Sequence, residues 1–239
     1  MIAGTARSGV WAVVPAAGRG ARAGGELPKQ YQPLLGRPMI EHTLRALAAH
    51  PRIAGLVVVL AANDVHWPGW RELEGKPVRT AIGGAERADS VLAGLDALPG
   101  KIAGTDFVLV HDAARPCLSH RDLDALLDGE APKGALLAVP LADTLKRADA
   151  DGRVGATVPR AGLWRASTPQ CFPRDALAQA LRAARAAGVT VTDEAMAMER
   201  AGFRPALIEG AADNIKVTTP RDFALAEFLL ARRALEPKP

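Results

Sequence analysis

Short apolar runs alternate with amphipathic stretches over the amino-terminal part of the chain. The apolar runs predict buried strands at residues 10–15, 55–60, 78–82, 107–110 and 135–139. Apolar residues at helical spacing predict helices from Pro38 to about 50, at 86–98, and in a segment capped by Ser119. This alternation predicts an α/β fold of Rossmann-like type. We expect a mostly parallel, twisted sheet with right-handed crossovers and helices on both faces.

Residues 140–164 break this pattern. Two short polar segments, 144–147 and 153–158, flank Asp151-Gly152, a pair that is typical of a hairpin turn. A hairpin with little apolar core of its own is marginal unless it packs on another surface. We therefore expect a protruding β-hairpin arm at about 140–164, carried by a single domain that spans 1–239; a hairpin lying in solvent is the alternative.

Helices and strands resume after the arm. Helices are predicted at 173–187, at 220–234 and after Thr192, which we expect to be the N-cap. Short strands are predicted at 204–208 and 214–217, and residues 63–75 are expected to form a loop with a possible short helix.

The loop after the first strand concentrates glycines and cations. Residues 16–31 contain Gly18, Gly20, Gly24, Gly25, Arg19, Arg22 and Lys29. Glycine allows backbone N–H groups to turn towards an anion and approach it closely. The P-loop pattern is absent, and the third glycine of the dinucleotide pattern falls one position late, at Gly24. The loop therefore favours a triphosphate over a dinucleotide; a solvated basic loop is the alternative.

Polar or glycine positions follow several predicted strands. Gly18, Gly84 and Asp112 each come shortly after a strand end. Ligands of open parallel sheets bind at the carboxyl ends of the strands. We therefore expect these three positions to gather at one site.

Several motifs occur in a fixed order over nearly the whole chain. They are Pro15-Ala16-Ala17-Gly18-x-Gly20-x-Arg22, Pro28-Lys29-Gln30-Tyr31, Gly83-Gly84-x-x-Arg87-x-x-Ser90-Val91, Val110-His111-Asp112-Ala113-Ala114-Arg115-Pro116, Thr168-Pro169-Gln170, Thr192-Asp193-Glu194-Ala195 and Asp213-Asn214-Ile215-Lys216-Val217-Thr218. Together they resemble the signature of the 2-C-methyl-D-erythritol 4-phosphate cytidylyltransferases, which are nucleotidyltransferases with a glycine-rich N-terminal loop.

The resemblance implies a reaction and its partners. CMP would pass from CTP to 2-C-methyl-D-erythritol 4-phosphate, giving 4-CDP-2-C-methyl-D-erythritol and pyrophosphate in non-mevalonate isoprenoid synthesis. The implied cofactor is Mg²⁺ or another divalent cation. The implied assembly is a homodimer formed through the arm, whose Arg160 would reach the neighbouring pocket.

The resemblance also implies residue roles. The catalytic set would be Arg22, Lys29 and Lys216. The nucleotide-binding set would be Ala16, Ala17, Gly18, Gly20, Gly84, Ser90 and Asp112. The acceptor-binding set would be Asp112, Arg115, Thr144, Arg160, Thr168, Thr192 and Lys216.

The chemistry of individual side chains leaves alternatives open. Asp112 would hold the metal indirectly or bond a substrate hydroxyl, with a turn cap as its structural alternative. Arg115 would bind phosphate or pair with Asp112, and Arg87 is either a structural ion pair or a ligand. His111 is expected to be structural, because the attacking phosphate is already ionised and needs no general base.

Composition narrows the function classes. The net charge of +4 on 239 residues is mild and the basic residues are dispersed, so we do not expect nucleic-acid binding. No apolar stretch approaches the roughly 18 residues of a membrane span. Cys117 and Cys171 form neither a metal spacing nor a disulfide framework, which fits a reducing cytoplasm.

Other functions remain as alternatives at this point. A ribitol-5-phosphate cytidylyltransferase shares the loop and the fold, although the motifs at 168–170 and 213–216 favour methylerythritol phosphate. A non-catalytic nucleotide-binding protein is disfavoured by Arg22 and Lys29. A dehydrogenase is disfavoured by the displaced Gly24.

Overall fold

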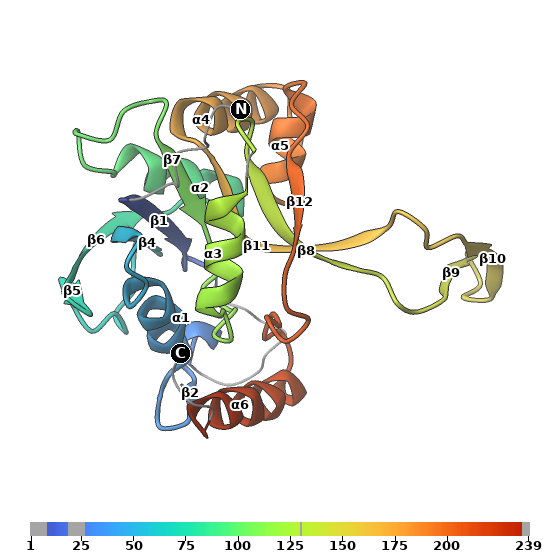
Figure 1. The fold of residues 1–239 in the computed structure, drawn as a ribbon, viewed down its shortest axis with the longest axis horizontal. Helices are drawn as coiled ribbons and strands as arrows, with labels where there is room; N and C mark the ends of the chain where they lie inside the picture. Colours follow the sequence, from blue (N-terminus) through green and yellow to red (C-terminus); the bar gives the residue numbers. More distant parts are fainter. Residues whose placement is uncertain (1–8, 19–26, 130, 236–239) are drawn as a thin grey trace.

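The fold is organised around one eight-stranded sheet with the strand order β12-β8-β11-β7-β1-β4-β6-β5 (Figure 1). The computed structural model describes residues 9–18, 27–129 and 131–235. The strands of this sheet are β1 (Val10–Pro15), β4 (Ile53–Leu60), β5 (Glu72–Leu73), β6 (Lys76–Ile82), β7 (Phe107–Val110), β8 (Ala135–Pro140), β11 (Trp164–Pro173) and β12 (Ala206–Glu209).

The sheet is mostly parallel, as predicted. β1 pairs in parallel with both β4 and β7, β4 with β6, and β8 with β12. The antiparallel strands are β11, which lies between β7 and β8, and the short edge strand β5. The chain runs outward from β1 to β4 and β6 and then returns to β7 on the other side of β1, so the strand order reverses between β1 and β7.

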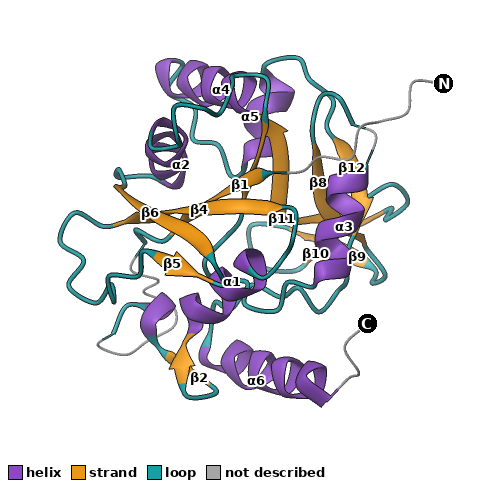
Figure 2. Cartoon of the chain, turned by 60° about the vertical axis from the view of Figure 1, so that its left-hand side comes forward, coloured by secondary structure: helices purple, strands orange, loops and turns teal. Residues whose placement is uncertain are grey.

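Helices cover both faces of the sheet (Figure 2). They are α1 (Met39–Ala48), α2 (Arg87–Asp96), α3 (His120–Asp128), α4 (Arg174–Ala186), α5 (Glu194–Arg200) and α6 (Pro220–Leu235). Side chains alternate along β1: Ala12 and Val14 pack with α1 and α3, whereas Trp11 and Val13 pack with α2, α4 and α5. The period of two explains why a strand buried on both faces has a continuous apolar sequence.

The helix α2 approaches β1 unusually closely. A Cβ atom on Gly94 would overlap Val13 Cγ1 and would lie 2.9 Å from Val59 Cγ2. Glycine at this position therefore lets the helix backbone lie directly against the sheet. The contact places the C-terminal half of α2 directly against β1 and β4.

A separate small cluster ties the segment that follows η2 to the helix α6. After η2 (Lys29–Tyr31), the strands β2 (Pro33–Leu34) and β3 (Arg37–Pro38) form a short antiparallel pair. Leu34 and Met39 pack with Val217 and with Ala226 and Leu229 of α6. Segments from the two ends of the chain thus lie side by side near the end of β1.

The predicted arm is a two-stranded antiparallel sheet of β9 (Leu145–Ala148) and β10 (Val154–Val158) that projects from the body (Figure 1). Gly152 has φ +76°, which agrees with a turn at Asp151-Gly152. Most residues of the two strands are exposed, including Val154 at 66%.

Three expectations about local structure are wrong. Residues 214–217 form no strand, because Val217 N–H donates to Ala114 O and the segment follows a loop across the site. Residues 63–75 contain β5 rather than a helix, and no element was predicted for residues 164–173, which form the central strand β11. Asp193, not Thr192, caps α5 by accepting a hydrogen bond from Met196 N.

Two structural features are absent from the described ranges. None of the helices there is both long enough and apolar enough to cross a membrane. Nor do those ranges bring together three or more His, Cys, Asp or Glu side chains that could hold a metal ion.

Candidate active site

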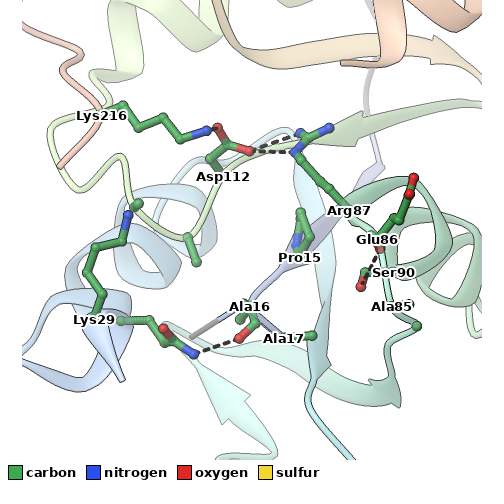
Figure 3. Close-up of a pocket in the computed structure, with 15 residues that line it drawn as sticks. Pro15, Ala16, Ala17, Lys29, Ala85, Glu86, Arg87, Ser90, Asp112 and Lys216 are labelled. Atoms are coloured by element: carbon green, nitrogen blue, oxygen red, sulfur yellow. Dashed lines mark hydrogen bonds and ion pairs between the residues drawn. The ribbon is translucent and has the colours of Figure 1, made fainter. Parts of the chain in front are cut away.

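A cavity of about 240 Å³ opens where the strand order reverses (Figure 3). Its lining comes from the carboxyl ends of β1 and β7, the start of α2, the η2 turn and the segment before α6. The lining residues are Pro15, Ala16, Ala17, Gly18, Lys29, Gln30, Gly84, Ala85, Glu86, Arg87, Ser90, Asp112, Ala113, Ala114 and Lys216. The three positions predicted to converge, Gly18, Gly84 and Asp112, are all among them.

Backbone hydrogen bonds fix the floor of the cavity. Ala16 N–H donates to Val59 O at 2.7 Å and continues the parallel ladder past the end of β1. The buried Gln30 side chain donates from Nε2 to Ala16 O at 2.7 Å. Gln30 thereby ties the η2 turn, and Lys29 with it, to the carboxyl end of β1.

The start of α2 closes another side, and its approach depends on two glycines. A Cβ on Gly83 would lie 2.6 Å from Ser90 Oγ and 2.8 Å from Ala17 Cβ. A Cβ on Gly84 would overlap the Cβ of Asp89. The Gly83-Gly84 pair therefore leaves room for Ser90 and the backbone after β1 to lie close together.

Two lysines from opposite ends of the chain point into the same cavity (Figure 3). Lys29 Nζ donates to Val217 O at 2.6 Å, which connects η2 to the residue next to Lys216. Lys216 Nζ lies 2.7 Å from Asp112 Oδ2. Two ammonium groups at the carboxyl ends of parallel strands create a site that favours phosphate.

Asp112 is a buried carboxylate surrounded by cations. Arg87 Nη2 lies 2.9 Å from Oδ1, Lys216 lies on Oδ2, and Arg115 Nε lies 3.8 Å from Oδ2. Burial alone would raise the pKa of this carboxyl. The charges of Arg87, Lys216 and Arg115 outweigh burial and hold the pKa well below its usual range, so Asp112 is ionised.

Arg115 is turned away from the cavity. Its Nη1 donates to Asn214 O at 2.7 Å, and 12% of the side chain is exposed. Burial lowers the pKa of its guanidinium against the opposing effect of Asp112. The contact pins the loop that carries Lys216 to the turn after β7.

His111 and Thr168 form a buried chain of hydrogen bonds behind Asp112. Asp112 N–H donates to Thr168 Oγ1 at 3.0 Å, and Thr168 Oγ1 lies 3.0 Å from His111 Nδ1. His111 Nε2 lies 3.2 Å from Arg115 O, a group that only accepts, so Nε2 carries the proton and Nδ1 accepts from Thr168. Burial lowers the pKa of His111 to about 4. The neutral imidazole supports the turn, as expected of a structural histidine.

Comparisons with known proteins identify the family. The profile of the 2-C-methyl-D-erythritol 4-phosphate cytidylyltransferases matches residues 10–232. The chain belongs to this family. A 2-C-methyl-D-erythritol 4-phosphate cytidylyltransferase of Xanthomonas oryzae pv. oryzae (strain PXO99A) is 60% identical over 229 residues, which cover 95% of this chain and 84% of the relative.

Solved structures of cytidylyltransferases share the fold. A 4-diphosphocytidyl-2C-methyl-D-erythritol synthase superposes with a TM-score of 0.78 at 39% identity, covering 94% of this chain and 99% of that one. The 2-C-methyl-D-erythritol 4-phosphate cytidylyltransferase of Thermus thermophilus has a TM-score of 0.74 at 33% identity, covering 93% of this chain and 98% of that one. The Rossmann-like α/β expectation is therefore confirmed, and the chain is an enzyme of the nucleotidyltransferase class.

The cytidylyltransferase residues expected from the motifs fall into three groups. Ala16, Ala17, Gly18, Lys29, Gly84, Ser90, Asp112 and Lys216 line the cavity. Arg115, Thr168 and Thr192 belong to neighbouring segments outside that lining, and Thr144 and Arg160 lie on the arm. Gly20 and Arg22 lie outside the described residues.

Seven lining residues were not among the predicted site residues, and three of them, Gln30, Glu86 and Arg87, have polar side chains. Gln30 and Arg87 stand inside the quoted motifs, so their place in a motif was the available signal. Glu86 precedes α2 and forms a capping box with Asp89. The contacts of Gln30 and Arg87 could not be predicted from spacing, because Gln30 binds a backbone carbonyl and the partners of Arg87 are distant in sequence.

Asp112 does not fit as a direct metal ligand in this arrangement. Its Oδ1 is occupied by Arg87 and its Oδ2 by Lys216. A hard cation with several ligand waters would find no free carboxylate oxygen here. The residues fit only an indirect contact between Asp112 and a metal ion.

The buried neutral His111 predicts a pH dependence of stability. An unfolded histidine titrates near 6.5 and the folded His111 near 4, so the unfolded chain binds more protons between these values and stability falls as pH is lowered. Between pH 7 and pH 5 we expect His111 to account for a loss of about 2 kcal/mol in the free energy of unfolding. Urea titrations at both pH values measure it.

Two variants distinguish the contribution of His111 to this pH dependence from the contributions of other groups. His111→Asn should be less stable at pH 7 but should lack this part of the pH dependence. His66→Asn, at an exposed position, should keep the full dependence. An unchanged pH slope in His111→Asn would contradict a neutral buried imidazole.

Proposed function

We propose that this cavity transfers CMP from CTP to 2-C-methyl-D-erythritol 4-phosphate, which produces 4-CDP-2-C-methyl-D-erythritol and pyrophosphate. The observation that carries the proposal is the meeting of Lys29 and Lys216 in one cavity at the strand-order reversal, with Asp112 between the sheet and Lys216. Family membership and the 60% identical relative support the reaction and the acceptor.

The bonding changes require no general base. An ionised phosphate oxygen of the acceptor attacks the α-phosphorus of CTP, and the bond from that phosphorus to the bridging β-oxygen breaks. The electron pair leaves with pyrophosphate. The barrier arises mainly from the repulsion of two anions and from charge building at the α-phosphate, so placement and positive charge are what the protein must supply.

Lys29 and Lys216 supply that charge in this proposal. Lys29 is anchored through Val217 O, so its ammonium group is already held at the cavity. Lys216 is held by Asp112, and its side chain is 42% exposed, which leaves it able to turn towards an incoming phosphate. Arg22, outside the described residues, remains a predicted third cation.

The divalent cation and the compartment are also proposals. We assign Mg²⁺, or another divalent cation, to the triphosphate of CTP, because Asp112 has no free oxygen for it. We assign the reaction to the cytoplasm; Cys117 and Cys171 are both buried thiols, which supports a reducing compartment.

The alternatives are weakened by the comparisons. The matched family profile and the Xanthomonas relatives are named for methylerythritol phosphate, not ribitol phosphate. The family and its 60% identical relative are named as cytidylyltransferases, which disfavours a non-catalytic binding protein. We therefore retain ribitol 5-phosphate only as a control substrate.

Pyrophosphate release tests the reaction and the acceptor together. With CTP and Mg²⁺, we expect release with methylerythritol phosphate and none above background with ribitol 5-phosphate. Lys29→Ala should lower kcat by about 10²- to 10³-fold, because it removes charge stabilisation in the transition state. Lys101→Ala, at an exposed lysine remote from the cavity lining, should match the wild type.

Three other outcomes would contradict different parts of the proposal. Release with ribitol 5-phosphate alone would overturn the acceptor. Tight CTP binding without release with either acceptor would favour a binding protein. Equal activity of Lys29→Ala and Lys101→Ala would remove Lys29 from the mechanism.

We also propose that the arm pairs two copies of the chain. The exposed strands β9 and β10 bury little of their own surface, and isolated two-stranded sheets are marginal in water. Thr144 and Arg160 flank these strands and do not line the cavity of their own chain. In a homodimer they would complete the partner's acceptor site.

Mixing two inactive variants tests this arrangement. Arg160→Ala and Lys29→Ala are each expected to be nearly inactive as pure dimers. In a mixed dimer, one site would combine an intact body with an intact arm. Co-refolding equal amounts should therefore restore about a quarter of wild-type activity, because half of the dimers are mixed and each has one intact site.

If the activity of the mixture stayed at the mean of the activities of its two components, the shared site would be contradicted. A matched mixture of Lys29→Ala with Lys216→Ala serves as the control. Both changes lie in the body of the chain, so each mixed dimer has two damaged sites and no activity should return.

A further inference from the structure

A buried glutamate lies just behind the site and has no role in the proposed mechanism. Glu194 is the first residue of α5 and is fully buried, at 0% exposure. Its two carboxylate oxygens accept from Arg87, with Nη1 to Oε1 at 2.5 Å and Nη2 to Oε2 at 3.1 Å. This is a two-pronged pairing that arginine can make and lysine cannot.

The same guanidinium reaches into the cavity. Arg87 Nε donates to Asp112 Oδ1 at 3.0 Å, and Nη2 lies 2.9 Å from the same oxygen (Figure 3). Arg87 therefore occupies one oxygen of Asp112 and leaves the other for Lys216. One arginine bridges two buried carboxylates, only one of which borders the cavity.

The charges of the three groups depend on one another. Burial raises the pKa of Glu194, with Arg87 acting against it, and burial likewise opposes the charge of Arg87, whose pKa is nevertheless raised by Glu194 and Asp112. Without a second carboxylate, the guanidinium would be free to turn around Asp112. With Glu194 in place, its orientation is set from two sides.

Glu194 itself has little freedom to move. Gln170 Oε1 accepts from Ala195 N at 2.8 Å, and Gln170 Nε2 donates to Asp193 Oδ2 at 2.9 Å. These bonds fix the start of α5 to the central strand β11. The anchor of Arg87 is thus built on the sheet.

The bridge joins two parts of the chain with different predicted roles. Arg87 begins α2, next to Gly84 and Ser90, which are predicted to bind the nucleotide. Glu194 follows Thr192, which is predicted to bind the acceptor. Arg87 pairs with Glu194 on one side and with Asp112, the partner of Lys216, on the other.

We propose that Glu194 is a positioning residue: it holds Arg87 on Oδ1 of Asp112, so that Oδ2 holds the Lys216 ammonium group in position for the acceptor phosphate. Neither Glu194 nor Arg87 takes part in bond making. This inference rests on the proposed function. Loss of the pairing between Glu194 and Arg87 should impair use of the acceptor rather than binding of CTP.

A double-mutant cycle tests the inference. Glu194→Gln removes the charge and keeps the shape, and we expect it to lower kcat/KM for methylerythritol phosphate by about ten-fold, mainly through KM. In the Asp112→Asn background, Glu194→Gln should lower kcat/KM by less than about two-fold, because Glu194 acts through Asp112. The Kd for CTP, measured by calorimetry, should stay within about two-fold of the wild type.

Two further variants make the result decisive. Asp96→Asn breaks the exposed Arg182–Asp96 ion pair between α2 and α4 and should leave kcat/KM unchanged. Arg87→Lys keeps the charge but loses the two-pronged geometry, and should reproduce Glu194→Gln. Arg87→Lys also tests the inference if circular dichroism shows that Glu194→Gln is not folded.

Outcomes against the inference are distinct from failure of the function. Activity of Glu194→Gln or of a folded Arg87→Lys within two-fold of the wild type would overturn it. If the effects of Glu194→Gln and Asp112→Asn on kcat/KM were fully additive, the inference would also be overturned. Additive effects are expected when Glu194→Gln only weakens the structure in general and does not act through Asp112. An inactive wild type would instead overturn the proposed function.

Discussion

The site depends on one constraint, which is that the buried carboxylate of Asp112 must be neutralised where the strand order reverses. Burial of a charge is costly unless oppositely charged groups compensate for it. Here the compensation comes from three separate segments, through Arg87, Arg115 and Lys216. The electrostatic requirement of one side chain thereby draws α2, the turn after β7 and the segment before α6 together around a single cavity.

The same constraint explains how a cation can be both held and available. Asp112 keeps Lys216 at the cavity while no phosphate is bound, and the remaining arginines can continue to neutralise Asp112 when Lys216 turns to a substrate. Lys29 is held differently, by the carbonyl of Val217, so the two lysines are linked through adjacent residues of one loop. Phosphate chemistry needs little more from a protein than such placed charge.

Local pattern was sufficient for the outline of the fold. The period of apolar residues located β1, β4, β7 and the helices between them, and the rule for parallel strand ends brought Gly18, Gly84 and Asp112 together. Prediction from local pattern failed where tertiary contacts determine which residues are buried or paired. Strand β11 contains the polar Ser167, Thr168 and Gln170, which are buried only because neighbouring strands and turns bond them. Arg87 and Glu194 are 107 positions apart, and no spacing rule connects them.

The most direct test of this account is a crystal structure with the product, 4-CDP-2-C-methyl-D-erythritol, bound. We expect the diphosphate to lie between the ammonium groups of Lys29 and Lys216 and the cytosine to lie towards Gly84 and Ser90. Arg87 should stay on Oδ1 of Asp112. A diphosphate bound away from both lysines, with Lys216 still paired only to Asp112, would contradict it.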